Sequence, residues 1–265
     1  MAPLRELEDA CAEAARRGGT VLAERWGKAR TIEHKGAIDL VTDADRASEA
    51  AVLGFLTSRF PAAAILAEES GERAGSGGLR FFVDPLDGTT NYAHGLPHFA
   101  VTVAVADAAG LAAGAILDPL RGELFTAARG AGASLGERRL AVSGRDRLME
   151  ALLVTGFPYD LQDGFEFTLR LFGAFALRAR GVRRLGSAAL DLAYVAAGRL
   201  DGFWEERLKP WDVAAGTLIV REAGGRVTDL GGGDGMLENG GIVAATPALH
   251  GQMLGVVAGA RSKGS

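Results

Sequence analysis

The chain has 265 residues, of which 48% are hydrophobic and 23% charged, and its formal net charge is −4. This composition is typical of a globular protein with a large core and excludes a disordered chain. The net negative charge does not favour binding to nucleic acid. The sequence has no uninterrupted run of about 18 apolar residues, so no membrane span is predicted. With a single cysteine, Cys11, and no signal-peptide apolar core, we expect a cytoplasmic protein that binds neither nucleic acid nor a membrane.

The first sixty residues predict two helices separated by an irregular segment. Apolar residues recur at helical spacing over 4–26, and a second helix is expected over 42–60. Thr42 and Asp45 have the spacing of a capping box at the start of that second helix. The intervening segment 27–41 lacks a helical period, which predicts a hairpin or a mobile loop.

The pattern then changes to strands. Short apolar runs bounded by turn residues predict buried strands over 63–67, 79–83, 99–107, 111–117 and 123–128. The last three are joined by short turns, which favours antiparallel pairing. Segments 71–78 and 130–136 are rich in glycine and are expected to be loops.

From residue 151 strands and helices alternate. Strands are expected over 152–155, 182–185, 202–205, 227–228 and 242–245. Helices are expected over 163–180, 187–198, 211–223 and 247–259, with a loop over 231–241. These elements predict helices layered against two sheets, with a mainly antiparallel N-terminal part and an α/β C-terminal part. We expect a single compact domain over 1–265, with approximate subdomains 1–150 and 151–265.

The segment DPLDGTTN over residues 84–91 carries the clearest chemical signal. Asp84 follows a predicted buried strand, and Pro85 suits the second position of a turn, so Asp84 and Asp87 are expected at the two ends of a four-residue turn. Two carboxylates and the Leu86 carbonyl would form a pocket of hard oxygen atoms, which Mg²⁺ prefers. The alternative is an ordinary Asp-Pro turn followed by a capped segment.

Residues that follow this turn, and acids elsewhere, add to the signal. Gly88 allows close approach of a ligand to the backbone, and Thr89 offers an N–H group and a hydroxyl to a phosphate. Glu68 ends another predicted strand, while Asp45 and Asp212 lie at predicted helix starts, where each is equally explained as a cap. Acids at strand ends and helix starts lie where an α/β architecture places its sites.

Other site types are poorly supported by the sequence. His94 and His98 are four residues apart, but Gly95 and Pro97 prevent a shared helix face, so a zinc site is not expected. The sequence has no phosphate-binding Walker loop, no dinucleotide fingerprint and no Gly-x-Ser-x-Gly motif.

Two long segments resemble the signatures of the inositol monophosphatase family. Residues 84–92 are similar to the first signature, and residues 211–216 with 222–225 are similar to the second. The resemblance extends from about residue 39 to 245, and the segment 155–159 is similar to the bacterial branch. It implies a layered α-β-α-β-α sandwich of the sugar phosphatase fold and Mg²⁺-dependent hydrolysis of a phosphomonoester.

The resemblance also implies roles for particular residues. The metal ligands would be Glu68, Asp84, Asp87, Asp212 and the carbonyl of Leu86. Thr89, with Asp45 and Glu68, would orient the attacking water. The substrate-facing positions would be Asp87, Gly88, Thr89, Gly186, Ser187, Ala188, Glu205 and Asp212. Lys35 lies in the segment expected to approach the site.

Inositol monophosphate is the expected substrate, because the pair Thr90 and Asn91 resembles inositol-phosphate-type members. The alternatives within the enzyme class are fructose-1,6-bisphosphatase and histidinol-phosphate phosphatase activity. A non-enzymatic alternative is a phosphate- or metal-binding regulatory protein. The family further implies inhibition by Li⁺ and a homodimer.

Overall fold

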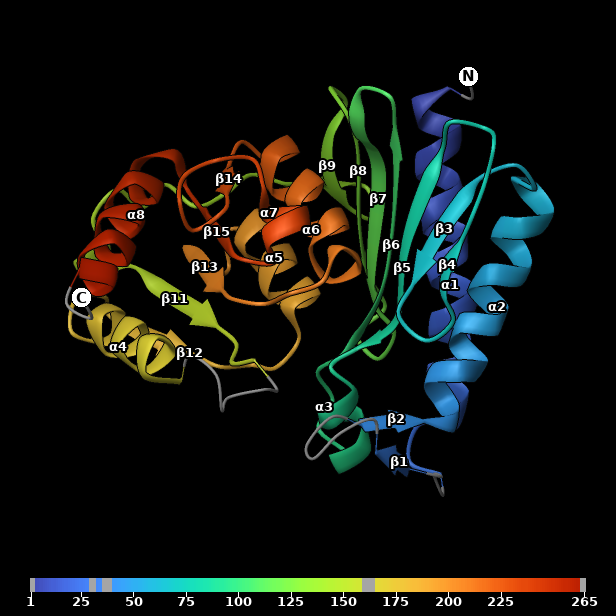
Figure 1. Ribbon diagram of the computed structural model, residues 1–265, viewed down its shortest axis with the longest axis horizontal. Helices are drawn as coiled ribbons and strands as arrows, with labels where there is room; N and C mark the ends of the chain where they lie inside the picture. The colour runs from blue at the N-terminus through green and yellow to red at the C-terminus, as the bar shows by residue number, and fades with distance from the viewer. Residues whose placement is uncertain (1–2, 29–31, 35–39, 159–164, 263–265) are drawn as a thin grey trace.

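The computed structural model describes residues 3–28, 32–34, 40–158 and 165–262. Helices and sheets alternate in five layers, as Figure 1 shows. The first layer holds helices α1 (Leu4–Arg25) and α2 (Asp43–Arg59), the middle layer α5 (Ala188–Ala196) and α6 (Pro210–Glu222), and the last layer α4 (Phe165–Ala176) and α8 (Pro247–Ser262). The expected α-β-α-β-α arrangement is confirmed.

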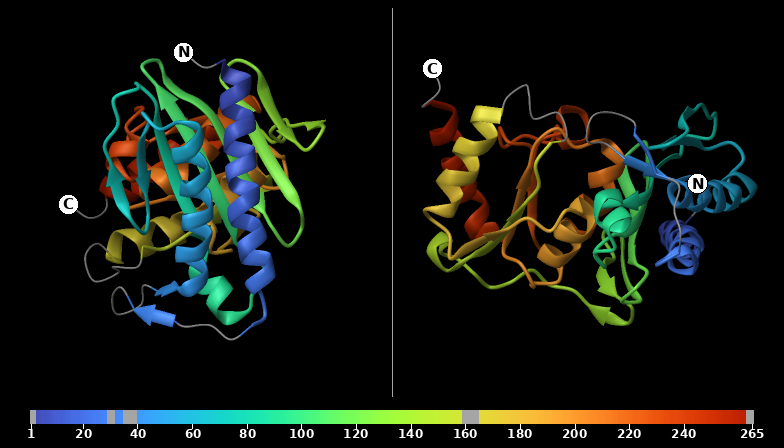
Figure 2. Two further views of the ribbon diagram at one scale, coloured as in Figure 1. Left: turned by 90° about the vertical axis from the view of Figure 1, so that its right-hand side faces the viewer. Right: turned by 90° about the horizontal axis from the view of Figure 1, so that it is seen from below.

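The larger sheet lies between α1 and α2 on one face and the middle helices on the other. Figure 2 shows α1 and α2 side by side across it. Its strand order is β10-β9-β8-β7-β6-β5-β3-β4, and within the described part of this sheet only the β3–β5 pair is parallel. The bounds are β3 Ala64–Ala67, β4 Gly71–Arg73, β5 Arg80–Asp87, β6 Ala100–Asp107, β7 Gly110–Asp118, β8 Glu123–Ala128, β9 Gly132–Leu135 and β10 Arg138–Arg139. The predicted antiparallel pairing is confirmed.

Strand β5 contains an irregularity that decides where its acids point. Asp84 pairs with Thr102 of β6 and Asp87 pairs with Ala100, so three steps along β5 match two along β6. In a regular strand, residues three apart lie on opposite faces. The extra residue is a β-bulge, and it returns Asp87 to the face occupied by Asp84. That face is the one covered by the middle helices, because Ala100 packs in their core.

The bulge replaces the four-residue turn expected after residue 83. The strand continues through the acidic segment to Asp87 instead of ending before it. Pro85 has no N–H to donate to a neighbouring strand, and a bulge is one of the few places in a sheet where proline is tolerated. The sequence pattern therefore predicted an irregular backbone at Asp84–Asp87 correctly, but the predicted geometry, a four-residue turn, was wrong.

The smaller sheet separates the middle helices from α4 and α8. Its order is β12-β11-β13-β15-β14. Strand β11 is parallel to its neighbours β12 and β13, and β15 is antiparallel to its neighbours β13 and β14. The bounds are β11 Leu152–Thr155, β12 Gly181–Arg183, β13 Gly202–Glu205, β14 Arg226–Thr228 and β15 Ile242–Ala245. Parallel strands joined through helices follow from the alternating pattern of the second half.

The middle layer is built from small residues, which lets its two helices approach closely. A Cβ added to Gly216 of α6 would lie 2.4 Å from the Leu192 side chain of α5. Ala189, Ala193 and Ala196 of α5 are fully buried in the same cluster. This contact holds α5 and α6 close together, and the N-termini of both helices contribute to the site described below.

Several short elements were not expected from the sequence. Segments predicted as loops contain β4, β9 and the short helix α7 (Met236–Asn239), and residues 89–94 form helix α3 (Thr89–His94). These elements are too short to show a period, and β4 and β9 are stabilised by pairing with neighbouring strands. In the segment 27–41, β1 (Ile32–His34) pairs antiparallel with β2 (Leu40–Thr42). Across the described residues, no helix has the length and apolar character needed to span a membrane.

Candidate active site

Asp87 joins the bulged strand to the middle layer. Its Oδ2 accepts a hydrogen bond from Ser187 Oγ at 2.5 Å and another from the Ala189 N–H at 2.8 Å. Both donors lie at the start of α5, where the free N–H groups and the helix dipole favour an anion. Burial nevertheless raises the pKa of Asp87 to about 6, because desolvation outweighs these bonds.

Asp84 and Asp212 bring two further buried carboxyl groups to the same place. The Leu86 N–H donates to Asp84 Oδ1 at 2.9 Å, and the Lys209 N–H donates to Asp212 Oδ2 at 2.7 Å as the cap of α6. Burial is the main reason why the pKa of Asp84 is raised well above its usual range, and the charges of Glu68, Asp87 and Asp212 add to it. The mutual influence places these carboxyl groups within electrostatic reach of one another.

Thr89 connects the cavity to Asp45. Its hydroxyl oxygen lies 3.1 Å from Asp45 Oδ1 and 3.0 Å from the Leu86 carbonyl, and its single proton can serve one acceptor at a time. Asp45 Oδ2 accepts from the N–H and the hydroxyl of Thr42, so the predicted capping box is present. Burial raises the pKa of Asp45 to about 6.

The opposite wall comes from the smaller sheet and α5. Glu205 ends β13, and its carboxylate packs so tightly on Gly156 that an added Cβ there would lie 2.2 Å from both carboxylate oxygens. Burial raises the pKa of Glu205 well above its usual range, helped by the charges of Asp212 and Asp87, while Arg184 opposes the shift. The Arg184 guanidinium lies 5.4 Å from the ring centre of Phe157.

These walls enclose a cavity of about 100 Å³. It is lined by Glu68, Asp84, Leu86, Asp87, Gly88, Thr89, Gly156, Phe157, Arg184, Gly186, Ser187, Ala188, Asp191, Glu205, Leu208 and Asp212. Among the described residues to which the resemblance assigns a metal-binding, catalytic or substrate-binding role, only Asp45 is not part of the lining, and it reaches the cavity through Thr89. Lys35 lies outside the described residues.

Sequence reasoning missed several lining residues. The sequence predicts Asp191 only as part of the helix over 187–198, although it lies one helical turn after Ser187 and that spacing could have identified it. Arg184 belongs to a basic run over residues 178–184, for which the sequence offers a solvated face or, for one arginine, the entrance of an anionic substrate. Gly156 belongs to the segment similar to the bacterial branch. Their positions depend on how the two sheets pack, which no local pattern reports.

Glycine is required where the two halves of the chain meet. Gly88 has φ +94°, and an added Cβ would lie 3.1 Å from the carbonyl oxygens of Gly186 and His98. The close approach predicted for Gly88 is therefore made by the protein's own backbone. Gly186 also has a positive φ, +86°, and sits against the Asn91 side chain.

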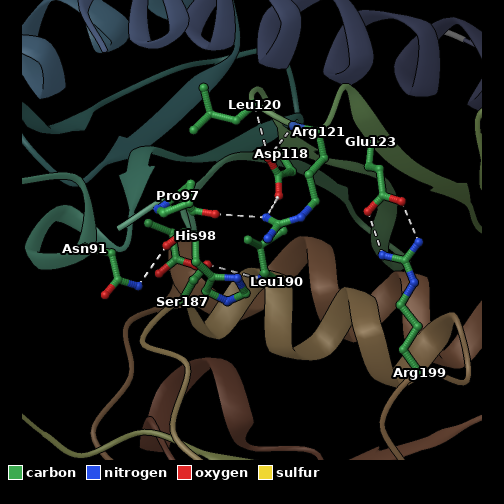
Figure 3. A network of polar contacts seen from close by, with 11 residues as sticks. Asn91, Pro97, His98, Asp118, Leu120, Arg121, Glu123, Ser187, Leu190 and Arg199 are labelled. Carbon is green, nitrogen blue, oxygen red and sulfur yellow. Dashed lines mark hydrogen bonds and ion pairs between the residues drawn. The ribbon is translucent and has the colours of Figure 1, made fainter. Parts of the chain in front are cut away.

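Asn91 fixes this junction by its side-chain amide. Its Nδ2 lies 2.8 Å from the carbonyl oxygens of both His98 and Leu185, and the bond to His98 is drawn in Figure 3. Beside it, Arg121 donates to the Pro97 carbonyl and to Asp118. This network holds the segment after α3 against the loop that leads into α5.

The donor set suits a hard divalent cation. Carboxylate and carbonyl oxygens are the ligands that Mg²⁺ uses. Burial raises the pKa values of Asp84 and Asp212 most, and a cation would offset the repulsion between acids that adds to this effect. No group of three or more His, Cys, Asp or Glu side chains in the described ranges is already arranged as a metal site. Several of the carboxylate oxygens instead accept protein hydrogen bonds, as at Asp87 and Asp212.

Comparison with known proteins agrees with this arrangement. Residues 4–262 match the sequence model described as the inositol monophosphatase family. A protein of Pseudomonas aeruginosa named Nus factor SuhB is 50% identical over 219 residues, which are 81% of each chain. An inositol-1-monophosphatase of Mesorhizobium japonicum is 44% identical over 250 residues, which are 92% of this chain and 93% of that one.

A solved structure extends the likeness to three dimensions. The inositol monophosphatase from Anabaena (Nostoc) sp. PCC 7120 superposes with a TM-score of 0.88 at 39% identity, covering 96% of each chain. The layered fold is therefore that of solved inositol monophosphatases. Because the family match covers nearly all of the sequence and both relatives align over most of their length, the chain belongs to the inositol monophosphatase family.

Proposed function

We propose that this protein is a Mg²⁺-dependent phosphatase that hydrolyses a small phosphorylated polyol, with inositol monophosphate as the expected substrate. The single observation that carries the proposal is the gathering of Glu68, Asp84, Asp87 and Asp212 around one cavity of about 100 Å³. Membership in the inositol monophosphatase family supports it.

Glu68, Asp84, Asp87, Asp212 and the Leu86 carbonyl would hold the metal. A divalent cation bound there supplies positive charge to the phosphate dianion and makes a bound water more acidic. The bonds from Ser187 and Ala189 keep one oxygen of Asp87 fixed, which leaves its second oxygen for the cavity. The Lys209 N–H likewise bonds only one oxygen of Asp212, which leaves the other oxygen for the cavity.

Thr89 and Asp45 would orient the attacking water and accept its proton. The Thr89 hydroxyl accepts from water and passes its own proton to Asp45 Oδ1, 3.1 Å away. Asp45 is able to accept because its pKa of about 6 leaves it mainly ionised at neutral pH. The N–H groups of Gly88 and Thr89 would bind phosphate oxygens.

The remaining wall would bind the alcohol part of the substrate. Ser187, Ala188 and Glu205 also border the cavity. A carboxylate is a good acceptor for sugar hydroxyls. Substrates with a second phosphate would meet more negative charge here, although Arg184 offers one cation at the same wall.

The test is a phosphate-release screen over inositol monophosphate, fructose 1,6-bisphosphate, histidinol phosphate and adenosine bisphosphate. Release should need Mg²⁺, stop in EDTA, return on adding Mg²⁺ and be inhibited by Li⁺. Preference for fructose bisphosphate or histidinol phosphate would select those alternatives. Full activity in EDTA would show that the proposed Mg²⁺-dependent mechanism is wrong.

A second candidate is a regulatory role, because a relative at 50% identity is named Nus factor SuhB. Under this alternative the protein would act as a Nus factor by contacting another protein, with or without phosphatase turnover. Binding of Mg²⁺ without release of phosphate from any substrate of the screen would favour the regulatory role over the phosphatase.

We also propose that the protein is a homodimer. Light scattering at micromolar concentration that gives the mass of one chain would oppose this.

A further inference from the structure

Asp191 is a buried acid that the proposed mechanism does not use. It lies in α5, one turn after the Ser187 whose hydroxyl contacts Asp87, and its own N–H donates to the Ser187 carbonyl at 2.9 Å. The side chain is 1% exposed. Neither carboxyl oxygen has a hydrogen-bond partner among the described residues. Buried polar groups are almost always hydrogen-bonded, so this one needs an explanation.

The surroundings of Asp191 make an unpartnered carboxyl group costly. The charges that act on it most are those of Glu205 and Asp87, both acidic, and together with burial they raise its pKa well above the usual range. An apolar residue would fill the same position in this Ala-rich helix without the cost of an unpaired buried carboxyl group. Packing therefore does not account for an acid at this position.

Asp191 lines the proposed substrate cavity together with Glu205 and Gly156. A molecule in that cavity can therefore supply the partner that the described residues do not. Only 1% of the residue is exposed, so the open space next to Asp191 is this cavity and not bulk solvent. A hydroxyl group of a molecule that fills the cavity has the chemistry required of a partner.

We propose that Asp191 is a specificity-determining residue that hydrogen-bonds a hydroxyl group of the substrate's polyol part. The inference rests on the proposed phosphatase function and extends it to the leaving group. A carboxyl group that finds its partner only in a hydroxyl discriminates against phosphate esters without one, because their binding leaves it unpaired. Glu205, whose position is fixed by Gly156, would serve a neighbouring hydroxyl.

The test compares Asp191→Asn and Asp191→Leu with the wild type. Three quantities are measured with inositol monophosphate: kcat, KM and the inhibition constant of inorganic phosphate, which has no polyol part. We expect Asp191→Leu to raise KM about tenfold, the loss of a hydrogen bond to a carboxyl group. Asp191→Asn should recover part of this, since an amide still bonds a hydroxyl. The inhibition constant of inorganic phosphate should stay within about twofold in both.

Thr217→Val is the matched control. Thr217 is also fully buried with an unpartnered hydroxyl among the described residues, but it does not line the cavity. Thr217→Val should leave KM unchanged. That result would show that removing a buried polar group without a hydrogen-bond partner does not by itself raise KM. If Asp191→Leu does not fold, Asp191→Asn still decides the matter, because a small rise in its KM with an unchanged phosphate constant is expected.

Other outcomes overturn the inference. An unchanged KM in both variants would show that Asp191 does not contact the polyol. A parallel weakening of inositol monophosphate and inorganic phosphate, or a raised Mg²⁺ requirement, would assign Asp191 to the phosphate or metal region instead. Wild-type protein that releases no phosphate would overturn the proposed function, and this inference with it.

Discussion

The side-chain nitrogen of Asn91 lies 2.8 Å from the carbonyl oxygen of Leu185, joining helix α3 to the loop that begins α5. Asn91 belongs to the same segment as Asp87, and Leu185 directly precedes the Gly186-Ser187 pair that meets Asp87. One amide therefore ties the strand that carries the acids to the helix whose N-terminus faces them.

Replacing Asn91 with alanine should weaken that junction. The carbonyls of Leu185 and His98 would lose their donor, at a cost of about 1–3 kcal/mol in the free energy of unfolding. The start of α5 would also be less well fixed, so KM should rise. Thermal melting and steady-state kinetics measure both effects. Asn239→Ala removes an amide that bonds Asp229 away from the cavity, and it should leave KM unchanged.

Asp87→Asn should fold normally and lose most of its activity. Asparagine can still accept from Ser187 and Ala189, but it lacks the charge that would offset Mg²⁺. We expect a large fall in kcat, a weaker dependence on Mg²⁺ and equal or higher stability in EDTA, since one of several repelling carboxylates is gone. Asp234→Asn, on an exposed side chain, is the charge-matched control. Wild-type turnover by Asp87→Asn would show that this strand is not the metal site.

Asp45 predicts a pH-dependent difference in stability. Its pKa rises from 3.8 to about 6 on folding, so between these values the folded state binds more protons than the unfolded state. The wild type then loses stability as pH rises through this window, by about 3 kcal/mol at most. Asp45→Asn cannot titrate there. In EDTA, the stability of the variant relative to wild type should increase from pH 4 to 6 and level off above 7. A constant difference would show that Asp45 has an ordinary pKa.

Gly156→Ala should disturb Glu205, the proposed contact for the polyol part of the substrate, without affecting the proposed metal ligands. The new methyl group would overlap the Glu205 carboxylate, which must move. KM for inositol monophosphate should rise several-fold, while the Mg²⁺ concentration for half-maximal rate should not change. Gly54→Ala adds a methyl group in open space on helix α2 and should only stabilise the protein, by about 1 kcal/mol. Unaltered kinetics in Gly156→Ala would mean that Glu205 is not used.

The sequence predicted the layered architecture because its long elements have clear periods. Helix α1 and strands β6 and β7 lie within a residue or so of their expected bounds. The acids of the bulge were proposed from the pattern over residues 84–91, and the family resemblance added Asp212 of α6 as a ligand; the structure gathers all of them around one cavity. Their roles as ligands stay predictions, as does the number of domains.

What the sequence did not predict depends on contacts between distant segments. Strand β4 exists because β3 offers it a partner, and its own three residues carry no pattern. Asp191 and Arg184 belong to the cavity only because the smaller sheet packs against α5 and brings Gly156 and Glu205 beside them. Local propensity has no information on such packing. The helical spacing from Ser187 indicates the face of α5 on which Asp191 lies, but not which residues of the smaller sheet meet that face.

The bulge in β5 also has a consequence for how this segment can vary. Asp84 and Asp87 are three residues apart and still share a face, because the bulge places one residue more between them than between their partners on β6. Deleting Pro85 or Leu86 would leave both acids on one face of a regular strand. The deletion would, however, remove backbone groups that the bulge supplies: the Leu86 N–H that bonds Asp84 and the Leu86 carbonyl beside Thr89, or the Pro85 carbonyl that accepts from Ser48. Length is thus more tightly constrained here than residue identity: a scan of single-residue deletions should find this short stretch intolerant even where conservative replacements survive.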